Sequence, residues 1–169
     1  MKRVTSILFL ACALGLSSVA FAQGMGSITK GGDFILKGGL SHWALFDDIG
    51  GGSGLFYVGA ERPFSNESNF TASADVQFST IGNRGFFYMG TAGVRYYLTE
   101  ALNGLNAGAW AVYDDGSLGA GAKLGYQIPA GRVFLDLGAG PAYIGGAGGG
   151  GTFLMSTASI GFRFGGEGE

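Results

Sequence analysis

Seven charged residues lie within apolar segments of this sequence, and their chemistry is that of ion pairs. Four are basic and three are acidic, so the set is close to neutral. Charged groups removed from water must be paired and hydrogen-bonded, because an isolated buried ion is costly. The pattern therefore predicts a self-neutralising network in the interior of the fold, formed by Lys37, Glu61, Asp75, Arg95, Lys123, Asp136 and Arg163.

A second constellation, around the single histidine, contains residue types that are used in nucleophilic catalysis. His42 follows Ser41, and Asp47 or Asp48 could supply an acid only if the chain after His42 folds back. A general base needs both a nucleophile and an orienting acid within hydrogen-bond reach. Alternation places His42 on the outward face and no catalytic motif surrounds it, so we predict no catalytic residue and no enzymatic activity.

The composition excludes several classes of protein. Only 13% of the residues are charged and 47% are hydrophobic, the reverse of an intrinsically disordered chain. A single cysteine excludes a disulfide framework and a cysteine zinc site. The net charge of −2 lacks the basic footprint of a nucleic-acid-binding protein. We therefore expect no nucleic-acid partner, and no motif indicates a cofactor or a metal.

The first 22 residues have the pattern of a secretory signal peptide. Lys2 and Arg3 form a basic start, residues 7–16 form a short apolar core, and Ala20 and Ala22 are the small residues that a signal peptidase reads. The apolar core is shorter than the ~20 residues of a membrane-spanning helix. We predict cleavage before Gln23, which leaves one domain over residues 23–169.

The exported domain alternates apolar and polar residues with a period of two, which is typical of β-strands. Clusters of Gly, Asn, Asp, Ser and Pro interrupt the alternation at points suited to tight turns. Connections this short make successive strands antiparallel neighbours. The sequence predicts an all-β, up-and-down meander with eight strands at residues 33–42, 54–62, 69–81, 86–98, 105–113, 118–128, 133–144 and 152–164.

The two faces of the predicted strands differ in polarity. In residues 69–81, Phe70 and Val76 share one face, whereas Asp75 and Gln77 share the other. A water-soluble barrel would carry a heavily charged exterior, and the few charges here are poorly suited to that. We therefore expect the apolar face to contact lipid and the polar face to line the interior of a closed transmembrane β-barrel. Residues 105–113 leave the direction of Trp110 open.

Three stretches of sequence carry a resemblance to a known family. They are residues 93–98 (Gly-Val-Arg-Tyr-Tyr-Leu), 125–128 (Gly-Tyr-Gln-Ile) and 135–143. With the strand count and the alternation, the exported chain resembles the small eight-stranded outer-membrane barrels of the OmpA-transmembrane and OmpX type. The family usually ends its last strand with a phenylalanine read by the barrel assembly machinery. Phe162-Arg163-Phe164 resembles that signal, although residues 165–169 follow it.

The resemblance implies an integral protein of the outer membrane that contacts outer-membrane lipids and lipopolysaccharide and is monomeric. With a periplasmic amino terminus, the connections at residues 44–53, 82–85, 114–117 and 145–151 are extracellular, and those at 64–68, 99–104 and 129–132 are periplasmic. The aspartates of the outer rim are interpreted as solvated turn formers, not as a cation site. They are Asp47, Asp48, Asp114 and Asp115.

Three functions remain open on the sequence alone. The first is a structural scaffold or narrow pore, because the interior of an eight-stranded barrel is filled by side chains. The second is a surface-binding or adhesion barrel, with Trp43 and Phe46 as exposed apolar contacts and a flexible glycine tract at residues 145–151. The third and weakest is an outer-membrane enzyme that modifies lipid A through His42.

Overall fold

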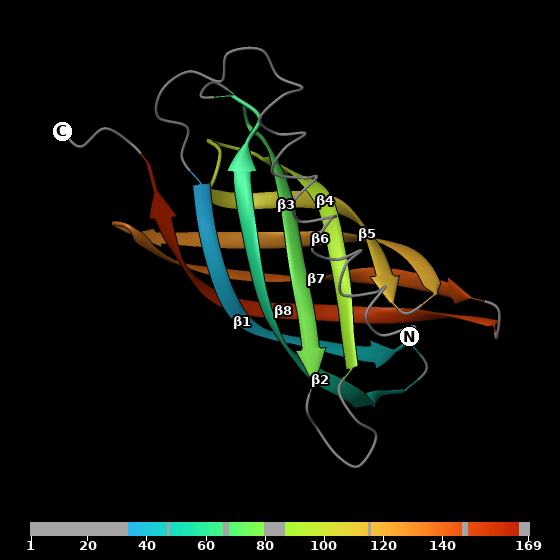
Figure 1. The fold of residues 1–169 in the computed structure, drawn as a ribbon. Helices are drawn as coiled ribbons and strands as arrows, with labels where there is room; N and C mark the ends of the chain where they lie inside the picture. The colour runs from blue at the N-terminus through green and yellow to red at the C-terminus, as the bar shows by residue number, and fades with distance from the viewer. Residues whose placement is uncertain are drawn as a thin grey trace, which may run out of the picture.

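The computed structural model is a closed barrel of eight antiparallel strands in which each strand pairs with the next and β8 pairs with β1 (Figure 1). The predicted up-and-down barrel is therefore confirmed. The strands are β1 (Phe34–Leu45), β2 (Asp48–Pro63), β3 (Phe70–Ser79), β4 (Phe87–Tyr97), β5 (Gly104–Asp114), β6 (Ser117–Ala130), β7 (Val133–Gly146) and β8 (Gly149–Phe164).

The structure describes residues 34–46, 48–65, 68–79, 87–114, 116–146 and 149–165. The predicted signal peptide, its cleavage before Gln23 and the predicted connection at 82–85 lie outside these residues. Within the described ranges there is no helix with the length and hydropathy needed to traverse a membrane.

The barrel has two ends with different connections. Phe34 and Phe164, the outer residues of β1 and β8, pair with each other at one end, which we call the terminal end. The turns that follow β2, β4 and β6 lie at the same end. At the opposite end, which we call the distal end, β1 leads into β2, β3 into β4, β5 into β6 and β7 into β8.

Two predicted connections at the distal end are largely strand, so their predicted boundaries were wrong. β1 continues to Leu45, which pairs with Asp48 of β2, where a loop at residues 44–53 was expected. The predicted flexible tract at 145–151 contains the register Gly145↔Gly150 and Gly146↔Gly149. An added Cβ at Gly145 or Gly150 would meet the Tyr143 ring, which therefore lies against this glycine ribbon. An aromatic ring that covers strand glycines in this way stabilises a ribbon that has few side chains of its own.

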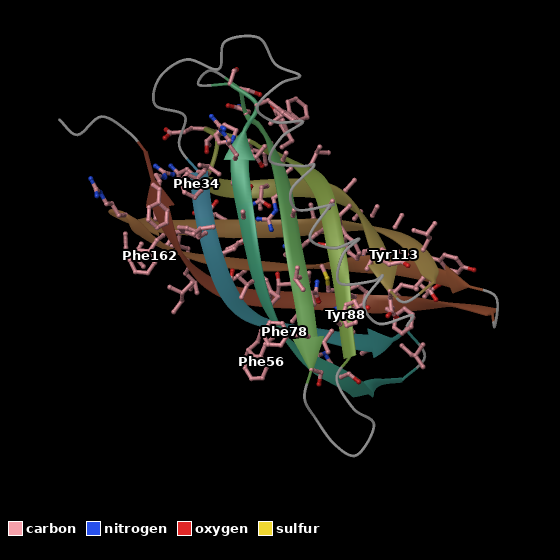
Figure 2. The ribbon with its side chains drawn as sticks, viewed as in Figure 1. Phe34, Phe56, Phe78, Tyr88, Tyr113 and Phe162 are labelled. Atoms are coloured by element: carbon pink, nitrogen blue, oxygen red, sulfur yellow. The ribbon has the colours of Figure 1, made fainter. Side chains whose placement is uncertain are left out.

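The outer surface of the barrel is apolar. Leu118 and Leu124 are 68% and 67% exposed. Phe56, Phe78 and Phe162 project away from the barrel wall (Figure 2). Outward aromatic rings also contact one another across strands near the terminal end, as Phe34 and Phe164 do with ring centroids 5.0 Å apart. The hydrophobic exterior expected from the alternation is thus a property of the folded chain.

Candidate functional site

The interior of the barrel holds a charge quartet, formed by Lys37 of β1, Glu61 of β2, Arg95 of β4 and Asp136 of β7. Lys37 Nζ lies 2.8 Å from Glu61 Oε2 and 3.3 Å from Asp136 Oδ2. Arg95 Nη1 lies 2.9 Å from Asp136 Oδ2 and 3.3 Å from Glu61 Oε2. Each cation therefore bridges both carboxylates, and all four side chains are buried.

Glu61 has two further partners that sequence reasoning did not identify. Thr71 Oγ1 donates to Glu61 Oε1 at 2.6 Å, and Tyr97 Oη lies 2.7 Å from the same oxygen. Tyr97 Oη is also 2.7 Å from the side-chain amide of Gln127. Tyr97 Oη donates to Glu61 Oε1 or to Gln127 Oε1, because a phenol has one proton and both of these oxygens are acceptors. Glu61 is thus held by four side chains from three strands, β1, β3 and β4.

A buried apolar layer closes the lumen at the terminal end. This terminal apolar layer consists of Ile35, Leu102 and Phe134. Leu102 lies in the turn between β4 and β5 and has a φ of 64°, a left-handed conformation that is uncommon for a residue with a branched side chain. Arg163 Nη2 donates to the Leu102 carbonyl at 3.0 Å. The turn is thereby held across the end of the barrel with its leucine turned inward.

A larger apolar layer closes the lumen toward the distal end. This distal apolar layer consists of Trp43, Leu55, Met89, Val112, Ala142 and Met155, with Trp110, Ile144 and Phe153 packed against it. Trp43 and Trp110 meet edge to face with ring centroids 5.6 Å apart. Trp43 Nε1 donates to Gln77 Oε1 at 2.9 Å. The prediction that Trp43 is an exposed rim contact was wrong, because its position in β1 points inward.

The remaining predicted charges lie inside the barrel but outside the charge quartet. Lys123 and Asp75 both line a cavity between the quartet and the distal apolar layer. Lys123 Nζ donates to Thr157 Oγ1 at 3.3 Å, and Asp75 Oδ1 accepts from Gln77 Nε2 at 3.1 Å. Within the described residues neither forms a salt bridge within 4.0 Å. The structure thus brings four of the seven charges together and leaves Lys123, Asp75 and Arg163 with other partners.

Inward-facing glycines make room for the large interior side chains. An added Cβ at Gly121 would meet the Trp110 ring, and one at Gly138 would meet the Lys123 side chain. Gly108 stands in the same relation to Arg95. In each case the glycine lies on the strand next to the large residue, as the small–large alternation of narrow barrels requires. The polar-face glycines of residues 118–128 are the signal in the sequence for this arrangement.

His42 lies on the outer surface, away from the interior groups. Its cross-strand neighbours are Gly54 of β2 and Ser156 of β8, whereas Ser41 points inward and donates to Gln77. No hydrogen bond to His42 is formed within the described residues. Asp47 and Asp115, predicted as rim residues, lie outside those ranges.

Comparisons with known proteins agree on the fold. No protein-family model matches the sequence, and no curated protein matches it. The chain is similar in structure to Ail, the attachment invasion locus protein of Yersinia pestis, solved in complex with the heparin analogue sucrose octasulfate. The TM-score is 0.50 at 13% identity, over 79% of this chain and 99% of Ail. The chain is also similar in structure to Neisserial surface protein A. The TM-score is again 0.50, at 16% identity, over 79% of this chain and 96% of the Neisserial protein.

Ail and the Neisserial protein are small eight-stranded outer-membrane β-barrels. The expected resemblance to such barrels is therefore confirmed for the fold. Identities this low carry the architecture alone, so the role of this chain has to be argued from its own residues.

Proposed function

We propose that this protein is an integral outer-membrane barrel that serves as a membrane-embedded scaffold with a closed lumen. The observation that carries the proposal is the inverted distribution of polarity. Leu124 is 67% exposed at mid-strand, whereas Asp136 is fully buried. Hydrocarbon cannot satisfy backbone N–H and C=O groups, and a closed barrel leaves no free sheet edge to satisfy. Such a surface is stable in a bilayer and unfavourable in water.

The outer membrane is the bilayer that best fits this barrel. The predicted signal peptide exports the chain, and the two structural neighbours share its architecture. We propose outer-membrane phospholipid and lipopolysaccharide as its lipid partners. The barrel assembly machinery is the partner proposed for biogenesis, through Phe162 and Phe164 at the end of β8. Both rings face outward beside β1, where such a factor could reach them.

The packing of the lumen supports a scaffold over a pore. The distal apolar layer, the charge quartet and the terminal apolar layer follow one another along the barrel axis. An ion entering from either end would first have to cross an apolar layer and then displace a fully paired set of buried charges. Breaking a buried ion pair without supplying another partner costs about 3–5 kcal/mol.

Planar-bilayer recording of the refolded chain tests the closed lumen. We expect a flat current trace at both polarities. Unitary current steps that change in amplitude in Arg95→Ala would contradict the scaffold and support a gated pore. The membrane assignment is tested separately by gel migration. We expect the detergent-folded barrel to migrate differently before and after boiling. A chain that stays monomeric and folded in buffer without detergent would contradict the membrane assignment.

A second candidate function is protein binding at the distal rim. Leu45 and Phe46 are exposed there, and Tyr143 is exposed on the β7–β8 ribbon. Among the described residues of the distal end none is Lys or Arg, and Arg84 of the connection between β3 and β4 lies outside them. The rim suits an apolar protein contact. Cell-binding assays comparing the unmodified chain with Phe46→Ser test this candidate, and no change in binding contradicts it.

The lipid A enzyme is the weakest candidate. His42 has glycine and serine as its cross-strand neighbours, and neither supplies an acid that could orient its ring. Mass spectrometry of lipid A from cells that express the chain or its His42→Ala variant tests it. Identical lipid A in both strains is expected.

A further inference from the structure

A cavity lies inside the barrel between the charge quartet and the distal apolar layer. Its volume is about 20 Å³. Its walls come from six strands and include Tyr57, Asp75, Trp110, Lys123, Met155 and Thr157. The cavity belongs to the interior of the barrel, so an inference about its contents goes beyond the proposed membrane function and does not depend on it.

The polar groups around this cavity have more hydrogen-bonding capacity than the protein uses. Tyr57 is only 4% exposed, and its hydroxyl makes no hydrogen bond within the described residues. The indole N–H of Trp110 is likewise without an acceptor there. Lys123 uses one of its three donors, on Thr157. Buried polar groups are almost always satisfied by protein or by ordered water, so these groups indicate an occupant.

The charges around the cavity determine the charge of that occupant. Lys123 and Asp75 have opposite charges and face the same cavity without forming a salt bridge. The third charged residue of the wall, Arg95, is already paired with Glu61 and Asp136. The described charges between the two apolar layers are balanced, because Lys37, Arg95 and Lys123 oppose an equal number of carboxylates. An anion would neutralise Lys123 but would leave Asp75 beside a second negative charge. A neutral molecule that both donates and accepts hydrogen bonds satisfies both residues.

The volume then identifies the molecule. A cavity of this kind needs roughly 10–15 Å³ to hold one water molecule, and a buried water needs two to four polar partners. We propose that the cavity is a binding site for one or two ordered water molecules that join the Lys123 ammonium to the Asp75 carboxylate. The bridge joins Lys123 and Asp75, which form no direct salt bridge within 4.0 Å, into a solvent-separated pair. The charges of Lys123 and Asp75 then balance each other on the distal side of the charge quartet.

Hydroxyl-radical footprinting by X-ray radiolysis tests the proposal, because radicals generated from a bound water oxidise the side chains beside it even when they are buried. Met155 and Met89 are a matched pair. Both are 4% exposed and both belong to the distal apolar layer, but only Met155 lines the cavity. In the detergent-folded full chain we expect Met155 to oxidise several-fold faster than Met89. Equal rates overturn the proposal.

A scavenger in the bulk solvent separates bound water from general solvent access. We expect the scavenger to protect exposed side chains and to leave the oxidation of Met155 unchanged. If Met155 is protected in parallel with exposed residues, the cavity is open to bulk solvent and the proposal is wrong. The double variant D75N/K123M removes both charges and is expected to bring Met155 down to the rate of Met89. If that variant does not fold, the comparison of Met155 with Met89 in the unmodified chain still decides the question.

Discussion

Arg95 Nη1 and Asp136 Oδ2 lie 2.9 Å apart, although their strands, β4 and β7, do not pair with each other. The contact therefore crosses the lumen and does not run along the sheet. Lys37 makes a similar crossing from β1 to the same carboxylate. Opposite walls of the barrel are thus joined through side chains as well as through the hydrogen bonds between neighbouring strands.

Removing one member of the charge quartet should destabilise the barrel strongly. In Arg95→Met, Glu61 and Asp136 are left with Lys37 as their shared cation. We expect a loss of about 3–5 kcal/mol, the usual cost of leaving a buried charge unpaired. Urea unfolding of the vesicle-folded protein measures this loss, with the exposed Arg132→Met as the control. A loss no larger than that of the control would contradict a paired interior.

The double variant Arg95→Met/Asp136→Asn tests whether the two residues act together. Partners in direct contact give non-additive losses. We therefore expect the double variant to lose less stability than the two single variants combined. Strict additivity in the same unfolding assay would show that the 2.9 Å contact contributes no coupling.

Charge placed on the outer surface should be tolerated according to depth in the bilayer. Leu124 lies at mid-strand in β6 and Leu118 near the distal end of the same strand, and the two are almost equally exposed. Arginine on a barrel surface costs about 2–4 kcal/mol at the midplane and about 0–1 kcal/mol near an interface. We expect Leu124→Arg to fold poorly into vesicles and Leu118→Arg to fold well, as followed by gel migration without boiling. Equal folding yields would argue against a lipid-facing surface.

The fit between Trp110 and Gly121 can be tested with a single methyl group. Gly121→Ala places a Cβ against the Trp110 ring, and such overpacking typically costs about 1–3 kcal/mol. Displacement of this ring should also change the near-ultraviolet circular dichroism of the Trp43–Trp110 pair. Gly54→Ala is the control, because an added Cβ there has nothing within 4 Å. An unchanged spectrum in Gly121→Ala contradicts the close fit.

At Leu102 a glycine variant should be at least as stable as an alanine variant, which is unusual for a buried leucine. Leu102→Ala keeps the positive φ and loses buried side chain, at about 2–5 kcal/mol for a typical leucine-to-alanine change. Leu102→Gly loses slightly more side chain but relieves the left-handed backbone, which costs a residue with a Cβ roughly 1–2 kcal/mol. We expect the glycine variant to be at least as stable as the alanine variant in urea unfolding. A clearly less stable glycine variant would contradict backbone strain at this turn.

The alternation of residue types was sufficient to predict the architecture, because the period of two assigns every strand residue to one of two faces. It also indicated the inward direction of isolated charges such as Asp136. Contacts across the lumen could not be predicted in the same way, since they depend on the shear of the closed barrel. The alternation alone therefore did not identify Tyr97 and Thr71 as hydrogen-bond partners of Glu61. It left Trp110 open because the middle of β5 is apolar on both faces, with alanines opposite Trp110 and Val112, and the structure places the Trp110 side chain inward.

A large interior side chain and the glycine that faces it on the adjoining strand share one space. The sizes of the two residues therefore depend on each other, both in evolution and in protein design. Enlarging Gly121 becomes acceptable only if the facing tryptophan shrinks, and the same rule joins Gly138 to Lys123. Related sequences should therefore exchange bulk between such partners while keeping the total roughly fixed. Homology searches that score such paired size changes should detect distant relatives that sequence identity at single positions misses.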